Sequence, residues 1–468
     1  MKKTCLLLAL LAALSAAALG TVHSSIHATS EQVVFRELPM AGDRSAADGL
    51  TVELNASIRD LLFWDTSFAP GPDQTETQAR FQRPPLKPET SLRSPHFFLY
   101  APINFGAGSN GSMFDEGDEL WMEEAFRELD AETPMGKSAS KEVLVSDYEE
   151  VYPNSVDLVL HHHSIHFDFF GDHYGGTNGA FTSQFLNAFR FPVLEGHRQE
   201  ITLEKGLDGS MQLTCNDTAS GVSIESVSCS SANYLYFVVN ARSNQDGSLL
   251  DYSHTPGGYG LYRLPVDKEE MTLEDLEMIY PLDPSYTICQ LRCTDDRHLL
   301  MLTTEQGQSF LRVLDLDRQQ ELQSVPLWTE SKDAWPDLVT DDDLVLVILG
   351  AQEQARLFRQ NPDGLCELLQ ELQMSATEEY PRLLSEISSM DWDGQRLAIL
   401  TRTVVPQAGP AYSSDYNASF SLLVFDRDGL QYLGSFLNSL NTEMGYNEDS
   451  RYRCRLTGDD PLTAHWSN

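Results

Sequence analysis

The stretch HLLMLTTEQGQSFLRVLDLDRQQELQSV, residues 298–325, holds three short runs that are rich in apolar residues. The first run, which starts at Leu299, is almost entirely apolar, and the last alternates between polar and apolar residues. Turn residues separate the runs, at EQGQ and again at DLDR. Short apolar or alternating runs between turn signals are typical of β-strands. This stretch therefore predicts three successive strands.

The pattern of a turn, an apolar strand and further strands recurs elsewhere in the chain. It is found at NYLYFVVNA (233–241), at DLVLVILGAQEQARLFRQNPDGLCELLQEL (343–372) and between residues 396 and 437. The apolar strands are spaced by 64, 45 and 53 residues, measured at Leu235, Leu299, Leu344 and Leu397. Periods of this length with about four strands per unit are typical of β-propeller blades. Inner strands are covered on both faces and read as apolar, whereas outer strands alternate.

Over residues 225–440 this repetition resembles the β-propeller superfamily in general, since the chain carries no blade signature of a particular family. The resemblance implies an all-β fold: a β-propeller of about seven four-stranded blades, within a range of six to eight, with few short helices in loops. It also implies a central channel and a face of long loops on which propellers bind their partners. The alternative is a four-blade C-terminal part behind a separate N-terminal β domain.

The first half of the chain is less regular, but its pieces fit the same pattern. LTVEL (50–54) and LLFWDTSF (61–68) read as two strands, 198–215 as a hairpin that turns at GLDG, and 117–131 as a helix. The expected organisation is a signal peptide at 1–20, an N-terminal segment at 21–48 that could supply the ring-closing strand, irregular blades with long loop insertions at 49–224, and regular blades at 225–468.

The chain begins with MKKTCLLLALLAALSAAALG, in which two lysines precede an apolar run and small residues follow it. This is the pattern of a secretory signal peptide. The run is shorter than the ~20 apolar residues of a membrane-spanning helix, although Thr21 and Val22 could extend it into an uncleaved anchor. The short Lys-Lys start is typical of bacterial signals. We therefore expect an exported bacterial protein, either secreted or at the cell surface.

The net charge excludes two classes of partner. Thirty-two lysines and arginines stand against 70 aspartates and glutamates, which makes the formal net charge −38. Such a field repels nucleic-acid phosphates and anionic lipids. We expect no nucleic-acid partner, and no membrane insertion beyond an uncleaved N-terminal anchor.

Six cysteines remain after Cys5 is removed with the signal, and an even number in an oxidising compartment permits up to three disulfides. Cys215 and Cys229 are the predicted pair, because they could face each other across adjacent strands.

The stretch LVLHHHSIHFDFFGDHY (158–174) holds five of the chain's twelve histidines. If residues 156–170 form one strand, His162, His166 and Asp168 lie on the same face. Two imidazoles and a carboxylate suit a divalent transition metal such as zinc, manganese or iron. The alternative is an edge strand whose polar side chains face solvent. The three adjacent histidines alternate between faces, so they cannot all converge on one ion.

The sequence favours a function without catalysis. GAGSNGS (106–112) lacks the GxSxG pattern of hydrolases and reads as a flexible loop, and the aspartates of the repeats lie at turns, where they bond their own backbone. The leading hypothesis is therefore an exported, non-catalytic binding or sensing module for a protein, peptide or glycan at the cell surface. The alternative is an extracytoplasmic hydrolase or lyase that acts on carbohydrate or peptide, with metal assistance from the histidine stretch.

Overall fold

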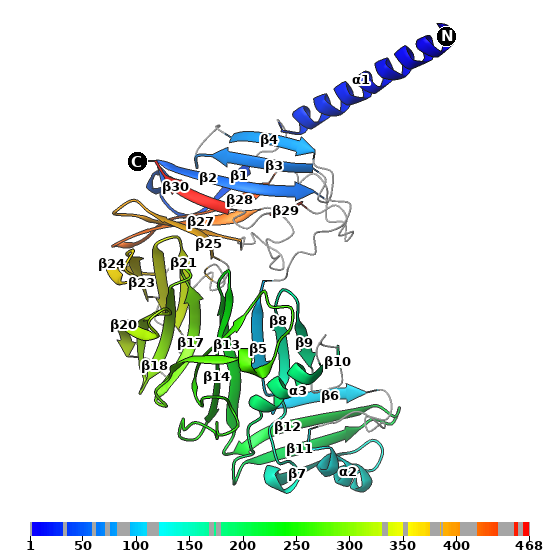
Figure 1. Cartoon of the computed structure of the whole chain (residues 1–468), viewed down its shortest axis with the longest axis vertical. Helices are drawn as coiled ribbons and strands as arrows, with labels where there is room; N and C mark the ends of the chain where they lie inside the picture. The colour runs from blue at the N-terminus through cyan, green and yellow to red at the C-terminus, as the bar shows by residue number, and fades with distance from the viewer. Residues whose placement is uncertain are drawn as a thin grey trace. The chain divides into compact units, whose positions relative to one another are not determined.

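The computed structural model describes residues 2–30, 35–58, 62–70, 75–81, 94–109, 121–167, 173–174, 179–329, 336–349, 354–374, 384, 387–402, 419–438, 454–456 and 462–467. Strands dominate these residues (Figure 1), and they form six sheets, which confirms the predicted all-β class. The chain divides into two compact units. The central unit comprises residues 90–338 and 361–366, and the terminal unit comprises 1–89, 339–360 and 367–468.

The stretch that predicted three strands folds as three strands of the central unit. They are β18 (His298–Glu305), β19 (Gln308–Asp315) and β20 (Gln320–Thr329), and β17 (Tyr286–Cys293) completes their antiparallel sheet. Leu299, Leu300 and Met301 are fully buried, so β18 is covered on both faces as its apolar sequence requires. Positive φ angles at Gln306 and Gly307 form the tight turn between β18 and β19.

An eight-stranded sheet runs through the central unit. Its order is β10 (His173–Tyr174), β9 (Ser164–Phe167), β8 (Ser155–Val159), β5 (His96–Tyr100), β13 (Val222–Ser230), β14 (Tyr234–Ser243), β15 (Gly260–Pro265) and β16 (Glu277–Pro281).

Aromatic rings fill the core beside this sheet. Phe237 on β14 lies 4.4 Å from Phe97, 5.5 Å from Tyr262 and 5.8 Å from Phe189, measured between ring centroids. Phe185 belongs to the same cluster, and it comes from α3 (Gly179–Ala188).

A four-stranded sheet, termed here the side sheet, is inserted in the sequence between β5 and β13. Its order is β6 (Phe105–Ser109), β12 (Met211–Ala219), β11 (Arg198–Lys205) and β7 (Ser138–Leu144). The predicted hairpin at 198–215 is confirmed by β11 and β12, with the turn at GLDG. Helix α2 (Glu123–Glu132) covers one face of the sheet through Ala125, Phe126 and Leu129 (Figure 1), within the region predicted as helical. Residues 110–120 lie outside the described part.

The terminal unit contains three sheets. One is β21 (Pro336–Asp341), β22 (Leu344–Leu349), β23 (Gln354–Gln360) and β24 (Cys366–Gln373), of which residues 336–338 and Cys366 fall in the central unit. The second is β25 (Ile387–Trp392), β26 (Leu397–Thr401), β27 (Phe420–Asp426) and β28 (Gly429–Asn438), which β1 (Phe35–Gly42) extends. The third is β29 (Cys454–Leu456), β2 (Leu50–Ile58), β3 (Leu62–Phe68) and β4 (Thr75–Phe81), with β30 (Leu462–Trp466) on β2.

The predicted strands at 50–54 and 61–68 are thus β2 and β3. Stacked rings of Phe35, Phe68, Phe420 and Phe436 join the N-terminal and C-terminal strands of this unit.

Residues Lys2–Ser30 form helix α1, which covers the predicted signal segment. No helix in the described residues is long and apolar enough to span a membrane.

The histidine stretch does not form one strand. Instead, β8 and β9 are an antiparallel hairpin, and the turn between them holds Leu160, His161, His162 and His163. The main-chain N–H of Leu160 donates to the carbonyl of His163 and closes this turn. The prediction of a single strand over 156–170 is therefore wrong, because the chain reverses at the histidines.

Candidate functional site

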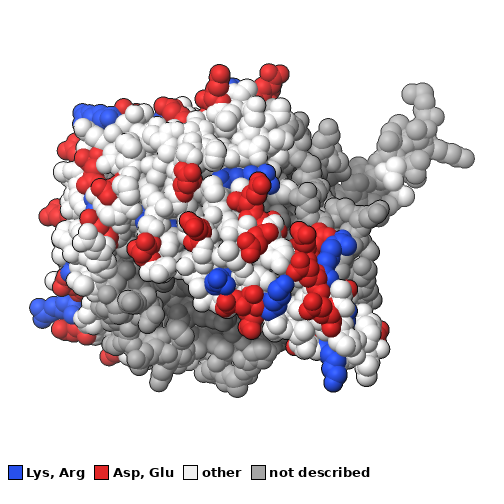
Figure 2. Space-filling model, turned by 90° about the horizontal axis from the view of Figure 1, so that it is seen from below, with Lys and Arg blue, Asp and Glu red and all other residues white. Residues whose placement is uncertain are grey.

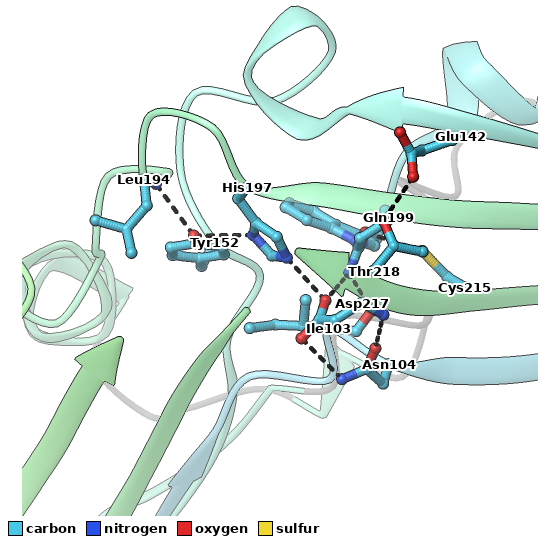
Figure 3. Close-up of polar contacts among 11 residues, drawn as sticks. Ile103, Asn104, Glu142, Tyr152, Leu194, His197, Gln199, Cys215, Asp217 and Thr218 are labelled. Carbon is cyan, nitrogen blue, oxygen red and sulfur yellow. Dashed lines mark hydrogen bonds and ion pairs between the residues drawn. The ribbon is translucent and has the colours of Figure 1, made fainter. Parts of the chain in front are cut away.

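A network of polar side chains is centred on Asp217 of the side sheet (Figure 3), with His197 and Gln199 buried, Asp217 half-buried and Asn104 exposed. His197 immediately precedes β11 and is fully buried, and its Nε2 lies 2.8 Å from Asp217 Oδ1 on β12. Gln199 Nε2 donates to the same oxygen at 2.8 Å, and Asn104 Nδ2 donates to Asp217 Oδ2 at 3.2 Å. Because an ionised carboxylate only accepts hydrogen bonds, His197 Nε2 must carry the proton that it shares with Asp217.

Tyr152 extends this network into a chain of three groups. Its hydroxyl lies 3.0 Å from His197 Nδ1 and accepts the main-chain N–H of Leu194 at 3.1 Å. With the proton of neutral His197 on Nε2, the Tyr152 hydroxyl donates to Nδ1. The order hydroxyl, imidazole, carboxylate is that of a nucleophilic relay.

The hydrogen-bonded set of Tyr152, His197 and Asp217 nevertheless has a structural role and not a catalytic one. Tyr152 is buried, and burial raises the pKa of its hydroxyl to about 12. A nucleophile needs a lowered pKa and access to substrate, and Tyr152 has neither. Instead, its two hydrogen bonds tie the loop around residues 191–197 to the segment that precedes β8, where Tyr152 lies.

Asp217 holds the centre of this network as an anion. Burial alone raises the pKa of its carboxyl, but the hydrogen bonds from His197, Gln199 and Asn104 outweigh that effect and keep the pKa below its ordinary value of 3.8. Because the pKa of Asp217 is lower in the folded chain than in the unfolded chain, its ionised carboxylate stabilises the fold at a pH above the unfolded-state pKa. This stabilisation disappears as the pH falls through the folded-state pKa.

We expect Asp217→Asn to reduce the free energy of unfolding at pH 7 by about 1–3 kcal/mol, since it leaves buried donors poorly paired. The difference from the wild type should shrink as the pH falls from 3.8 toward the lower pKa of the folded state, because the unfolded wild-type chain binds a proton at Asp217 before the folded chain does. Urea unfolding at pH 7, 5 and 3 measures both effects. Glu200→Gln, on the exposed face of the same sheet, is the control that should leave stability unchanged. A deficit that is equal at all three pH values would contradict the charged role of Asp217.

The opposite face of the side sheet is exposed and polar. The strand registers place Gly106, Thr214, Thr202 and Ser140 in one row and Gly108, Gln212, Glu204 and Ser138 in the next. A hydrogen bond of 2.8 Å between the Ser140 and Thr202 hydroxyls confirms that these side chains share a face. Side chains on paired strands are held more rigidly than those on loops, which suits a binding surface.

An open groove of about 590 Å³ lies over the second row. Its lining comprises Gly108, Gly136, Lys137, Ser138, Glu204, Lys205, Gly206, Ser210, Met211 and Gln212. The charge of Lys205 is already paired, since Nζ lies 2.8 Å from Asp130 Oδ1. Glu204 is the one acid in the lining, Lys137 adds a second ammonium group, and amide, hydroxyl and main-chain groups supply the other hydrogen-bonding atoms.

Figure 2 shows one face of the molecule, on which carboxylates are more abundant than lysines and arginines.

The histidines of the predicted metal site contact two different carboxylates. His162 Nε2 lies 3.1 Å from Asp267 Oδ1, whereas His166 Nδ1 lies 3.8 Å from Asp157 Oδ1. Asp168 lies outside the described residues, so the metal set of His162, His166 and Asp168 stays a prediction, which elemental analysis of the purified protein can test. Among the residues with described positions, no group of three or more His, Cys, Asp or Glu side chains is arranged to hold a metal ion.

The predicted disulfide partners have different neighbours. Cys215 is a buried free thiol that donates to Gln199 Oε1 at 2.9 Å, within the network around Asp217. Cys229 is also free, and its sulfur lies 3.3 Å from that of Cys293.

Sequence reasoning missed the buried network. Its members are isolated polar residues from separate parts of the chain, and only their fold brings them together. One signal was available: in RQEITLEK the apolar residues Ile201 and Leu203 continue an alternation that begins at Gln199. That alternation places Gln199 on the buried face, where an amide needs polar partners.

Comparison with known proteins identifies no family. No protein-family model and no curated protein matches the chain. Among solved structures, a prolyl endopeptidase aligns with 82% of this chain at 12% identity and a TM-score of 0.22, and the chain spans 42% of that protein. An auxiliary nutrient binding protein from Bacteroides thetaiotaomicron aligns at 8% identity and a TM-score of 0.25, covering 87% of this chain and 95% of that one. At these values neither fold nor activity is transferred to the chain.

Proposed function

We propose that this chain is an exported, non-catalytic binding protein whose ligand occupies the groove on the side sheet. The observation that carries the proposal is the row of Gly108, Gln212, Glu204 and Ser138, which crosses all four strands and lies in the lining of that groove. An enzyme of the hydrolase or lyase class needs two cooperating groups, such as a pair of carboxylates. The groove supplies one carboxylate, and the relay-like set of Tyr152, His197 and Asp217 is not in its lining.

The chemistry of the lining favours a neutral ligand rich in hydroxyl groups, such as an oligosaccharide. The planar carboxylate of Glu204 and the amide of Gln212 stand opposite each other, and each can bond two neighbouring hydroxyls. Ser138 adds a hydroxyl that can both donate and accept, whereas the Ser210 hydroxyl donates to Asp208 Oδ1 at 2.6 Å and is left to accept. An anionic ligand is disfavoured because the protein carries a net charge of −38.

The glycine at the edge of the groove leaves room for such a ligand. A Cβ atom added to Gly108 would meet only the carbonyl oxygen of Met211, at 3.8 Å. A side chain therefore fits at this position without a backbone clash and would fill the groove. Gly106, two residues earlier on β6, is equally open but does not line the groove.

We expect Gly108→Phe to weaken binding at least tenfold, about 1.4 kcal/mol, because the ring occupies the ligand's place. Wild-type protein is first screened on an array of neutral oligosaccharides, and calorimetric titration with the best-binding glycan then compares the variants. Gln212→Ala should also weaken binding, by loss of a hydrogen-bonding amide.

Gly106→Phe is the matched control and should bind as the wild type does. Equal binding by Gly108→Phe, Gln212→Ala and the wild type would overturn the groove as the ligand site. If the protein binds only glycans that carry carboxylate or sulfate groups on the array, and no neutral glycan, the proposed ligand class would be overturned.

We further propose that the sheets other than the side sheet form propeller blades, and that the side sheet is an insertion. Side chains of one strand bond the main chain of the first strand of a neighbouring sheet in several places. In the central unit, Ile288 of β17 bonds both atoms of the Asn240 amide, and Leu338 N donates to Gln290 Oε1 at 2.7 Å. In the terminal unit, Trp466 N donates to Asp391 Oδ2 at 2.6 Å. The C-terminal strand β30 on β2 supports ring closure, since it completes a sheet begun near the N-terminus.

Export is the remaining part of the proposal, and the sequence of residues 1–20 supports it. Mass spectrometry of the N-terminus of the protein recovered outside the cytoplasm tests it, and distinguishes cleavage from an anchor.

A further inference from the structure

Two thiols from neighbouring sheets of the central unit lie in contact. Cys229 is near the end of β13, opposite Tyr236 of β14, and Cys293 ends β17, opposite Leu299 of β18. Their sulfur atoms are 3.3 Å apart, and both residues are half-buried. A disulfide bond is ~2.05 Å long, so a small rotation of the two side chains brings the sulfurs to bonding distance.

We propose that Cys229 and Cys293 are joined by a disulfide in the exported protein. The pair replaces the predicted partner of Cys229, because Cys215 is fully buried and hydrogen-bonded to Gln199. The proposal rests on the proposed export, because export would bring the protein to an oxidising compartment. The short distance between the two sulfurs does not depend on export. Disulfides form and persist in oxidising compartments outside the cytoplasm.

The reaction is an exchange with an external disulfide, such as oxidised glutathione. One cysteine loses its proton and its thiolate attacks the external disulfide, which releases one glutathione thiolate and leaves a mixed disulfide. The second cysteine then loses its proton and attacks the protein-bound sulfur, which releases the second glutathione. The protein loses two electrons and two protons, and two molecules of glutathione carry them.

The surroundings make the Cys229 thiol hard to ionise. The hydrogen bond with Cys293 and the burial of the site raise the pKa of the Cys229 thiol well above its ordinary range. Because the thiolate is the nucleophile, this raised pKa slows attack by Cys229.

The bond would connect β13 of the eight-stranded sheet to β17 of the next sheet along the chain. It closes a loop that runs from residue 229 to residue 293, which contains β14, β15 and β16. A disulfide across a loop of this length stabilises mainly by restricting the unfolded chain. Oxidation should therefore raise the apparent Tm by roughly 5–15 °C.

The test uses the full chain, purified under reducing conditions and then treated with oxidised glutathione. The remaining thiols are alkylated, the protein is digested without reductant, and linked peptides are identified by mass spectrometry. We expect a peptide pair joined through Cys229 and Cys293, and a higher Tm in the oxidised sample. Cys229→Ser and Cys293→Ser should each abolish the linked pair and the Tm difference.

Cys215→Ser is the control, and it should keep both the linked pair and the Tm difference. The proposed pair would be overturned if Cys229 is linked to Cys215, or if Cys229 and Cys293 are both alkylated after oxidation. This result comes from the wild-type chain alone, so it does not depend on how the variants fold. If the protein forms the disulfide in vitro but is recovered from cells with both thiols reduced, formation of the disulfide during export would be overturned. The groove and its ligand are tested separately by the titrations.

Discussion

Deletion of residues 462–468 should abolish the cooperative folding of the terminal unit. These residues contain β30, whose five residues pair with β2 from Leu50 to Leu54. Leu462 and Ala464 are buried, and the guanidinium of Arg396 lies 4.0 Å from the centre of the Trp466 ring. Loss of a buried leucine and a buried tryptophan costs roughly 5–10 kcal/mol, which is comparable with the whole stability of a domain.

Differential scanning calorimetry and limited proteolysis of the full-length and truncated chains measure this effect. We expect one melting transition to disappear and the strands of the terminal unit to become sensitive to protease, while the strands of the central unit stay protected. His465→Ala changes an exposed residue of the same strand and should leave both transitions in place. A truncated chain that melts like the full chain would show that β30 does not hold the unit together.

Phe237→Ala should reduce the free energy of unfolding of the central unit by about 3–5 kcal/mol. Phe237 is fully buried, and its ring contacts Phe97, Phe189 and Tyr262. Truncation removes the transfer free energy of the ring and leaves a cavity among neighbours that cannot collapse into it. Chemical denaturation monitored by tyrosine and tryptophan fluorescence measures the loss.

Phe98→Ala provides the matched control, because Phe98 is on β5 next to the same cluster but is 51% exposed. It should cost less than about 1.5 kcal/mol, since little of its burial is lost. Equal losses in the two variants would mean that the aromatic cluster is not the main source of stability.

The sequence was sufficient to predict a strand wherever that strand is covered on both faces or bounded by turn residues. Residues 298–325 predicted three strands and 198–215 predicted a hairpin, and both are confirmed. The turn inside the histidine stretch was missed because Leu160, His161, His162 and His163 include no glycine, proline, asparagine or aspartate. Without such a turn signal, a β-rich run reads as one strand.

The side sheet shows a second limit. GAGSNGS predicted a flexible loop, but Gly106, Ala107 and Gly108 are in strand β6, where pairing with β12 overrides the low strand propensity of glycine. The groove depends on that pairing, the network around Asp217 depends on the side sheet, and the contact between Cys229 and Cys293 depends on the packing of β13 beside β17. Each joins residues that are distant in the sequence, so none could be inferred from local patterns.

The pairing of β30 with β2 also has a consequence for the order of events during synthesis. The central unit is almost continuous in sequence, whereas the terminal unit needs residues from both ends of the chain. One side of β2 therefore stays unpaired until β29 and β30 have been synthesised. A unit that needs such late strands stays unfolded for most of synthesis, which suits the proposed export, because an unfolded chain can be threaded through a narrow translocation pore.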